Sequence, residues 1–257
     1  MSKVHLHFNC QGDALAGTLD LAPGTTGLLI VSGGNEIRAG AFSGQARLAA
    51  RVAAAGHPVF RFDRRGIGDS AGMNRGFRHS AADIGAALAT FRVQAPEMRR
   101  VFAFGNCDAA SALMLTGGAG CDGLILSNPW TIEEADDSAP PPAAVRARYF
   151  EKLKRPSEIG RLLRGGVDLG KLARGLKQAA KPAAAPSSLA GEMRGGLAVF
   201  RGDVRFVLAS CDRTAQAFDS QWDRSDPRIL RCEGASHGWV EPHARDWLFE
   251  RLIEALR

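Results

Sequence analysis

Short apolar runs alternate with segments whose apolar residues recur at helical spacing through the first half of the chain. The apolar runs predict strands, which we expect at 4–8, 15–21, 27–32, 59–63, 101–104 and 123–126. Helices are expected at 45–55 and 80–93. Strands and helices that alternate in this way predict a mostly parallel, twisted sheet with helices on both faces, so the expected fold class is α/β.

The alternation stops after Trp130 and resumes with expected strands at 205–209 and 228–231 and a closing helix at 242–256. A chain of 257 residues is long enough for one large α/β domain with an insertion. We therefore expect a single domain built from residues 1–130 and 197–257, interrupted by a helical lid insertion at 131–196.

The expected lid begins with a proline-rich loop at 136–142, and leucine and isoleucine at three- and four-residue spacing over 159–176 predict two short amphipathic helices. The run 181–188 has the composition of a flexible return linker. The segment from Arg146 to Lys181 carries eleven Lys/Arg and three acids, a local charge of +8 in a chain whose net charge is +6. The basic character therefore belongs to the lid.

This charge has three interpretations: recognition of an anionic or carrier-linked substrate, peripheral contact with a membrane surface, or a solvated surface without a ligand. Nucleic acid is not expected as a partner, because the basic segment has a single aromatic pair, Tyr149 and Phe150, and no binding motif.

The N-terminus has no signal-peptide pattern, and no segment approaches the roughly 18 apolar residues of a transmembrane helix. The five cysteines lack the spacing of metal ligands and are odd in number. These features predict a cytoplasmic protein with reduced thiols and with neither a metal ion nor a cofactor.

The run Gly105-Asn106-Cys107-Asp108-Ala109 has the pattern of a nucleophile elbow, a sharp turn from a strand into a helix, with cysteine at the nucleophile position. The expected strand at 101–104 precedes it and a run of helix formers at 110–115 follows. Taken alone, the pattern favours a buried structural cysteine over a catalytic one.

Two further residues favour catalysis. Asp212 follows the expected strand at 205–209, and His237 follows the expected strand at 228–231. Ligand and active sites of α/β sheets form where parallel strands end, and nucleophile, acid and histidine occur here in the chain order of α/β-hydrolase triads. Taken singly, Asp212 could instead cap a helix that begins near Thr214, and His237 could be an ordinary loop residue.

The whole chain resembles the α/β-hydrolase superfamily, since residues 63–70, DRRGIGDS, look like its D-x-R-G-x-G-x-S turn. More narrowly, GNCDAAS at 105–111, with FRFD at 60–63 and GGN at 33–35, is similar to the first type of exosortase A system-associated hydrolase. That resemblance implies a bacterial protein with cysteine at the elbow, associated with exopolysaccharide and exosortase loci. Asn106 departs from the more hydrophobic residue expected before the nucleophile.

An acyl-transfer site also needs donors for the oxyanion, typically the backbone N–H after the nucleophile and one from the loop after the third strand. Asp108 provides the first, and Gly34 is expected to provide the second, with Asn35 as the alternative and an ordinary Gly-Gly turn as the structural interpretation. The Asp108 carboxylate has two possible directions, facing the sulfur or pointing away from it.

The sequence therefore predicts a hydrolase that cleaves a small-molecule carboxylic ester or thioester through a thioacyl-enzyme, with Cys107 as nucleophile, His237 as base and Asp212 as its orienter. Two alternatives stay open. One is an acyltransferase with the same triad, and the other is a non-catalytic binding protein that uses the hydrolase fold and a basic lid.

Overall fold

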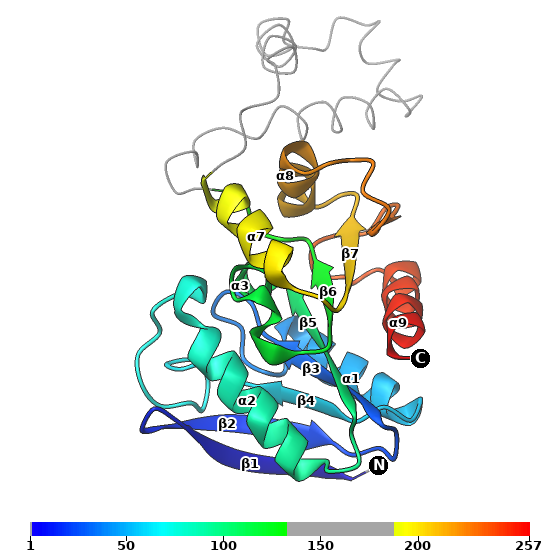
Figure 1. Cartoon of the computed structure of the whole chain (residues 1–257). Coiled ribbons are helices and arrows are strands. Elements are labelled where there is room, and N and C mark those ends of the chain that lie inside the picture. Colours follow the sequence, from blue (N-terminus) through cyan, green and yellow to red (C-terminus); the bar gives the residue numbers. More distant parts are fainter. Residues whose placement is uncertain (1, 133–187) are drawn as a thin grey trace, which may run out of the picture.

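The computed structural model describes residues 2–132 and 188–257, which form one layered α/β unit (Figure 1). The strands are β1 Lys3–Cys10, β2 Asp13–Asp20, β3 Thr26–Val31, β4 Val59–Phe62, β5 Arg100–Asn106, β6 Gly123–Ser127, β7 Asp203–Ala209 and β8 Ile229–Cys232. The α-helices are α1 Gly44–Ala54, α2 Ala81–Gln94, α3 Asp108–Leu115, α7 Ser188–Val199, α8 Arg213–Gln221 and α9 Pro242–Leu256. Short 3₁₀ helices span Ala41–Ser43, Phe77–His79 and Gly117–Gly120.

The strands form one eight-stranded sheet in the order β1-β2-β4-β3-β5-β6-β7-β8. The β1–β2 and β2–β4 pairs are antiparallel, and every later pair is parallel. Because β3 and β5 to β8 run in the same direction, the loops that follow their carboxyl ends gather at one edge of the sheet.

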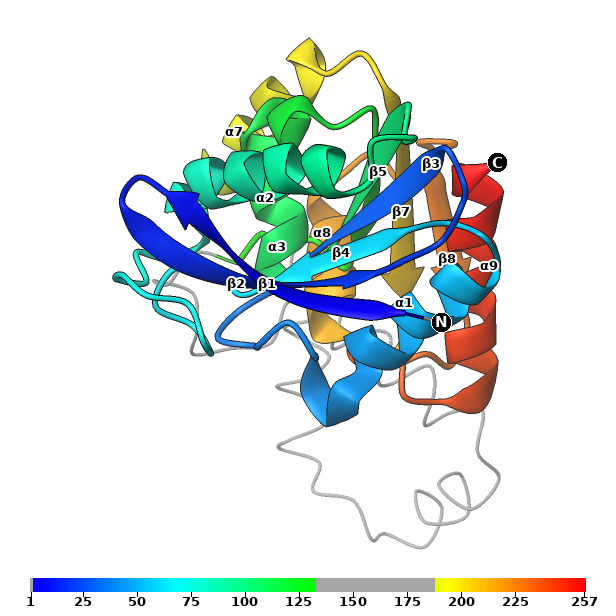
Figure 2. The same cartoon turned by 90° about the horizontal axis from the view of Figure 1, so that it is seen from below.

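Helices cover both faces of this sheet, α1 and α9 on one side and α2, α3 and α7 on the other (Figure 2). Each face has its own hydrophobic core, and successive strand residues alternate between the two cores. In β5, for example, Val101 and Ala103 belong to the core under α2 and α3, whereas Phe102 and Phe104 belong to the core under α1 and α9. Full burial on both faces explains why the central strands are continuous apolar runs rather than alternating ones.

The expected strands and helices of both core segments are present, with ends that differ by at most two residues. The helix α7 is the exception. The expected flexible linker reaches Ser188 and the expected lid reaches residue 196, but Ser188–Val199 is a single helix that packs on α3 through Leu189 and Met193. The predicted boundary between lid and core therefore falls inside a helix of the core. The two predicted lid helices lie outside the described residues.

Candidate active site

Cys107 lies in the turn between β5 and α3, with φ 62° and ψ −127°. This is a backbone conformation that side chains other than glycine rarely adopt, and its cost is acceptable where the surroundings hold it in place. The amide of Cys107 donates to the carbonyl of Ser127 at 3.0 Å, and its carbonyl accepts from Ala110 at 3.1 Å. A Cβ added at Gly105 would lie 2.8 Å from the backbone of Ala109. The turn therefore has the geometry of the elbow that the sequence predicts.

Asp212 and His237 meet at the same sheet edge, beyond the ends of β7 and β8. The Nδ1 atom of His237 lies 2.8 Å from Oδ2 of Asp212, whose side chain is 6% exposed. The same carboxylate accepts the backbone N–H groups of Thr214 and Ala215, each at 3.2 Å, at the start of α8. Asp212 therefore caps α8, and the same carboxylate also contacts the His237 ring.

Hydrogen bonding to Asp212, followed by hydrogen bonding to Cys107, raises the pKa of His237 from 6.5 to about 10, although burial opposes the shift. Because Asp212 occupies Nδ1, the nitrogen left for the thiol is Nε2. The resting site thus favours a protonated imidazole between a carboxylate and the cysteine sulfur.

This shift has a measurable consequence, because the pKa of His237 in the folded protein exceeds the unfolded value of 6.5. The stability that His237 contributes is complete below pH 6.5 and is lost as the pH rises through about 10. In an NMR titration of the histidine rings, with His237→Gln to assign the signal, we expect a midpoint far above 6.5. Asp212→Asn should lower that midpoint more than Cys107→Ser, since Asp212 is the larger cause. A wild-type midpoint near 6.5 would contradict the ion-pair arrangement.

The loop after β3 lies directly against the elbow. A Cβ on Gly33 would lie 2.6 Å from the carbonyl oxygen of Asn106, so glycine permits the close approach. The amide of Gly34 points toward Asp108, but it donates to the Asp108 carboxylate at 2.6 Å. The carboxylate thus points toward the Gly34 loop. The side chain of Asn35 accepts from Asn74 at 3.0 Å on the exposed surface.

Hydrogen bonds and an ion pair from the turn at 63–70 hold the loop after β3 in place. The carboxylate of Asp63, fully buried, accepts the amide of Arg38 and also pairs with its guanidinium. Arg64, 4% exposed, donates to the carbonyl of Gly34 and to the hydroxyl of Ser80. The motif therefore fixes the loop after β3 through buried charged groups whose hydrogen-bonding capacity is used.

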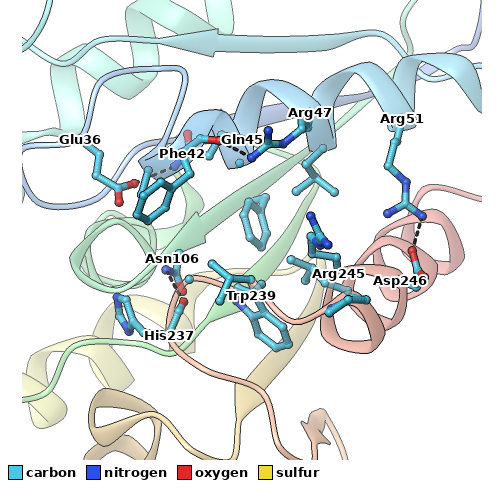
Figure 3. Close-up of a pocket in the computed structure, with 18 residues that line it drawn as sticks. Glu36, Phe42, Gln45, Arg47, Arg51, Asn106, His237, Trp239, Arg245 and Asp246 are labelled. Atoms are coloured by element: carbon cyan, nitrogen blue, oxygen red, sulfur yellow. Dashed lines mark hydrogen bonds and ion pairs between the residues drawn. The ribbon is translucent and has the colours of Figure 1, made fainter.

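A cavity of about 540 Å³ opens beside His237, between α1 and α9 (Figure 3). Its walls include the buried apolar side chains of Phe104, Trp239 and Leu248. The guanidinium groups of Arg47 and Arg245 line the same cavity. Glu36 and Asp246 line it too, so the cavity combines apolar walls with side chains of both charges.

The family model described as "Serine aminopeptidase, S33" matches residues 26–199 of the chain. The chain belongs to this α/β-hydrolase family. A comparison with curated proteins found no matching sequence.

Solved α/β-hydrolase structures share the fold at low sequence identity. The α/β hydrolase GrgF from Penicillium sp. sh18 matches with a TM-score of 0.63 at 16% identity, covering 100% of this chain and 98% of that one. An esterase from Pyrococcus furiosus matches at 0.62 and 14% identity, covering 99% and 90%. The thioesterase domain from the curacin biosynthetic pathway matches at 0.59 and 12% identity, covering 98% and 100%. At these identities the likeness shows the fold.

One set of site residues in this hydrolase was not predicted from the sequence. Asn106 Nδ2 donates to the carbonyl of His237 at 3.2 Å, and its Oδ1 accepts from Ser127 at 2.7 Å and from Asn128 at 3.0 Å. The indole of Trp239 donates to the Ser127 hydroxyl at 3.0 Å. This network joins the elbow to the histidine loop, which gives a physical reason for the polar residue before the nucleophile. Its only sequence signal is the departure at Asn106 itself.

No helix among residues 2–132 and 188–257 is long and apolar enough to span a membrane.

Proposed function

We propose that this α/β hydrolase cleaves a carboxylic ester or thioester, with Cys107 as the nucleophile, His237 as the proton carrier and Asp212 as the group that orients His237. The observation that carries the proposal is the 2.8 Å contact between Asp212 and His237, because this pair shares the sheet edge with a cysteine held at a strained elbow. Nucleophilic catalysis requires this spatial arrangement, in which a nucleophile lies beside a base and a third residue orients the base.

In the first step the proton of the Cys107 thiol is held on Nε2 of His237, the sulfur attacks the substrate carbonyl, and a tetrahedral oxyanion forms. The oxyanion collapses, the bond to the leaving oxygen or sulfur breaks, and the imidazolium of His237 gives its proton to that leaving atom. A thioacyl-enzyme and an alcohol or thiol result. The raised pKa of His237 suits this role, since the ring carries its proton before the substrate arrives.

In the second step the neutral His237 takes a proton from water, and the hydroxide attacks the thioacyl carbonyl. The carboxylic acid leaves and the proton returns to the Cys107–His237 pair. The hydrogen bond to Cys107 is one cause of the raised pKa of His237. Acylation of the sulfur removes this hydrogen bond, so the pKa of His237 falls when it must act as a base.

The cavity beside His237 supports a substrate with an apolar part of moderate size, and Arg47 and Arg245 on its wall support an anionic or carrier-linked end. Solved structures of the same fold include proteins described as an esterase and as a thioesterase domain. The resemblance to the exosortase-associated hydrolases adds a role in bacterial exopolysaccharide metabolism to the proposal. The five free cysteines support a cytoplasmic location.

Transfer of the acyl group to an acceptor other than water uses the same residues. The His237 side chain is 43% exposed, which favours water as the acceptor. A binding protein without catalysis would have no need for the raised pKa of His237. The following experiment distinguishes such a binding protein from the proposed hydrolase.

The test is covalent trapping at Cys107. Intact-protein mass spectrometry after mixing with p-nitrophenyl acetate or an acetyl thioester is expected to show one acetyl adduct in the wild type and none in Cys107→Ala. Cys211, an exposed thiol at the same sheet edge, provides the matched control, because Cys211→Ala should keep the adduct. If wild type and Cys107→Ala carry the same adduct, or if neither is acylated by any ester or thioester, the proposal is wrong.

A further inference from the structure

The Asp108 carboxylate occupies the Gly34 N–H, the donor that the sequence predicts for a substrate oxyanion. Its Oδ1 atom accepts the backbone N–H of Gly34 at 2.6 Å. A Cβ built on Gly33 would lie 2.9 Å from this Oδ1 and 3.6 Å from the Cβ of Cys107. The carboxylate therefore packs closely against the loop after β3, next to the Cys107 side chain. The side chain is 16% exposed.

This position conflicts with oxyanion stabilisation for two reasons. The Gly34 N–H has one proton, and a hydrogen bond at 2.6 Å to a carboxylate is of the short, charge-assisted kind. A second negative charge that develops within a few ångströms of the carboxylate is repelled, most strongly where water is excluded. With Asp108 in this position, the Gly34 N–H is taken, and the backbone N–H of Asp108 is the one of these two expected donors that is left for an oxyanion.

A second partner is available to the same carboxylate. Nη2 of Arg64 lies 3.6 Å from Oδ2 of Asp108. Arg64 is held by Ser80 and by the Gly34 carbonyl, so its guanidinium is fixed and can receive the carboxylate without moving. Asp108 also begins α3, and its charge favours the helix N-terminus in either orientation.

We infer that Asp108 is a gate on the oxyanion hole: its carboxylate blocks the Gly34 N–H at rest, and when a substrate carbonyl enters it releases Gly34 and keeps the ion pair with Arg64. The inference rests on the proposed function, since it concerns the same acyl transfer at Cys107. In this role the Asp108 carboxylate limits the reaction of Cys107 with esters that bind too weakly to displace the carboxylate from Gly34. Substrates with strong contacts elsewhere, such as in the cavity beside His237, would open the gate with that binding energy.

Two rate constants measured at Cys107 separate the gate from ordinary thiol reactivity. Acylation by p-nitrophenyl acetate passes through an oxyanion, whereas alkylation by iodoacetamide is a direct displacement at carbon that needs no oxyanion hole. Both are measured in a Cys211→Ala background, so that the exposed thiol does not contribute. We expect Asp108→Ala to raise the ratio of acylation to alkylation at least tenfold, because one oxyanion-hole donor is worth about 10²–10³ in rate.

Asp108→Asn keeps the size of the side chain and can still accept from Gly34, but without the charge. We expect its ratio to lie between those of the wild type and Asp108→Ala. Glu192→Ala is the matched control, since it removes an exposed carboxylate on α7 that pairs with Arg78, and its ratio should equal that of the wild type. Circular dichroism confirms that each variant is folded.

The outcomes separate the gate from the proposed function. An unchanged or lower ratio in a folded Asp108→Ala would overturn the gate while acylation at Cys107 upholds the hydrolase. Alkylation without acylation in every variant would overturn both. If Asp108→Ala is unfolded, the Asp108→Asn ratio decides, and an unchanged value there overturns the gate.

Discussion

Asp212→Asn is expected to lower the acylation rate at Cys107 by about 10³–10⁴-fold while the protein stays folded. An asparagine in the orienting position of a triad favours the wrong histidine tautomer, an error worth about 10⁴ in rate. The 2.8 Å contact at Nδ1 would then join an amide to the ring, and the largest cause of the raised pKa of His237 would be lost. The imidazole would no longer be held as a proton donor for the leaving group.

The fold should tolerate this change because asparagine is as good a helix N-cap as aspartate. Asp212 accepts the backbone N–H groups of Thr214 and Ala215, and the Asn oxygen can accept at least one of them. Asp212→Ala removes the cap as well, and we expect it to be less stable than Asp212→Asn by about 1 kcal/mol. Stopped-flow acylation and urea unfolding of the two variants measure the two roles separately.

Equal activity of wild type and Asp212→Asn would show that Asp212 is a helix cap only. A large loss of stability in Asp212→Asn would show that charge, rather than a hydrogen-bond acceptor, is required at the start of α8. Either result would separate the two interpretations that the sequence left open for this residue.

The sequence was sufficient for the sheet and for the residues at its edge because the relevant signals are local. Each strand is a short apolar run, and Cys107, Asp212 and His237 each follow their own strand within a few residues. Parallel strands then bring residues far apart in sequence to one edge without any further information.

The contacts between these loops could not be predicted, because they depend on side-chain directions across the sheet edge. Asn106 contacts His237, which is 131 positions away in sequence, and the Trp239 indole reaches Ser127 across 112 positions. The hydrogen bond from the Gly34 N–H to Asp108 depends on the rotamer of the Asp108 side chain. Helix α7 was missed because its sequence is rich in glycine, and packing of Leu189 and Met193 on α3 compensates for that weak propensity.

Three of the seven non-glycine residues with positive φ in the described part of the chain lie in the loops at this edge. Cys107, Asn128 and Trp239 all have positive φ, at 62°, 44° and 53°, and none of them is a glycine. The three lie in or beside the network centred on Asn106, which provides the hydrogen bonds that hold such conformations. The position of the Cys107 thiol therefore depends on the close packing of the residues around the elbow.

Gly105→Ala tests that dependence. The added Cβ would lie 2.8 Å from the backbone of Ala109 and Ala110, and backbone atoms cannot move aside as a flexible side chain can. We expect a loss of about 1–3 kcal/mol in unfolding free energy, the usual cost of overpacking. A change of this size lowers the melting temperature by about 2–4 °C per kcal/mol in a protein of this length.

Acylation should fall by about 10²-fold or more in Gly105→Ala, because a displacement of about 1 Å at a reacting atom costs this much. Gly85→Ala is the matched control. Gly85 lies inside α2, a Cβ there has no neighbour within 4 Å, and alanine should stabilise the helix by about 0.5–1 kcal/mol without affecting Cys107. If Gly105→Ala is as stable and as rapidly acylated as Gly85→Ala, the close contact between β5 and α3 does not position the thiol, and the strained elbow has no part in its reactivity.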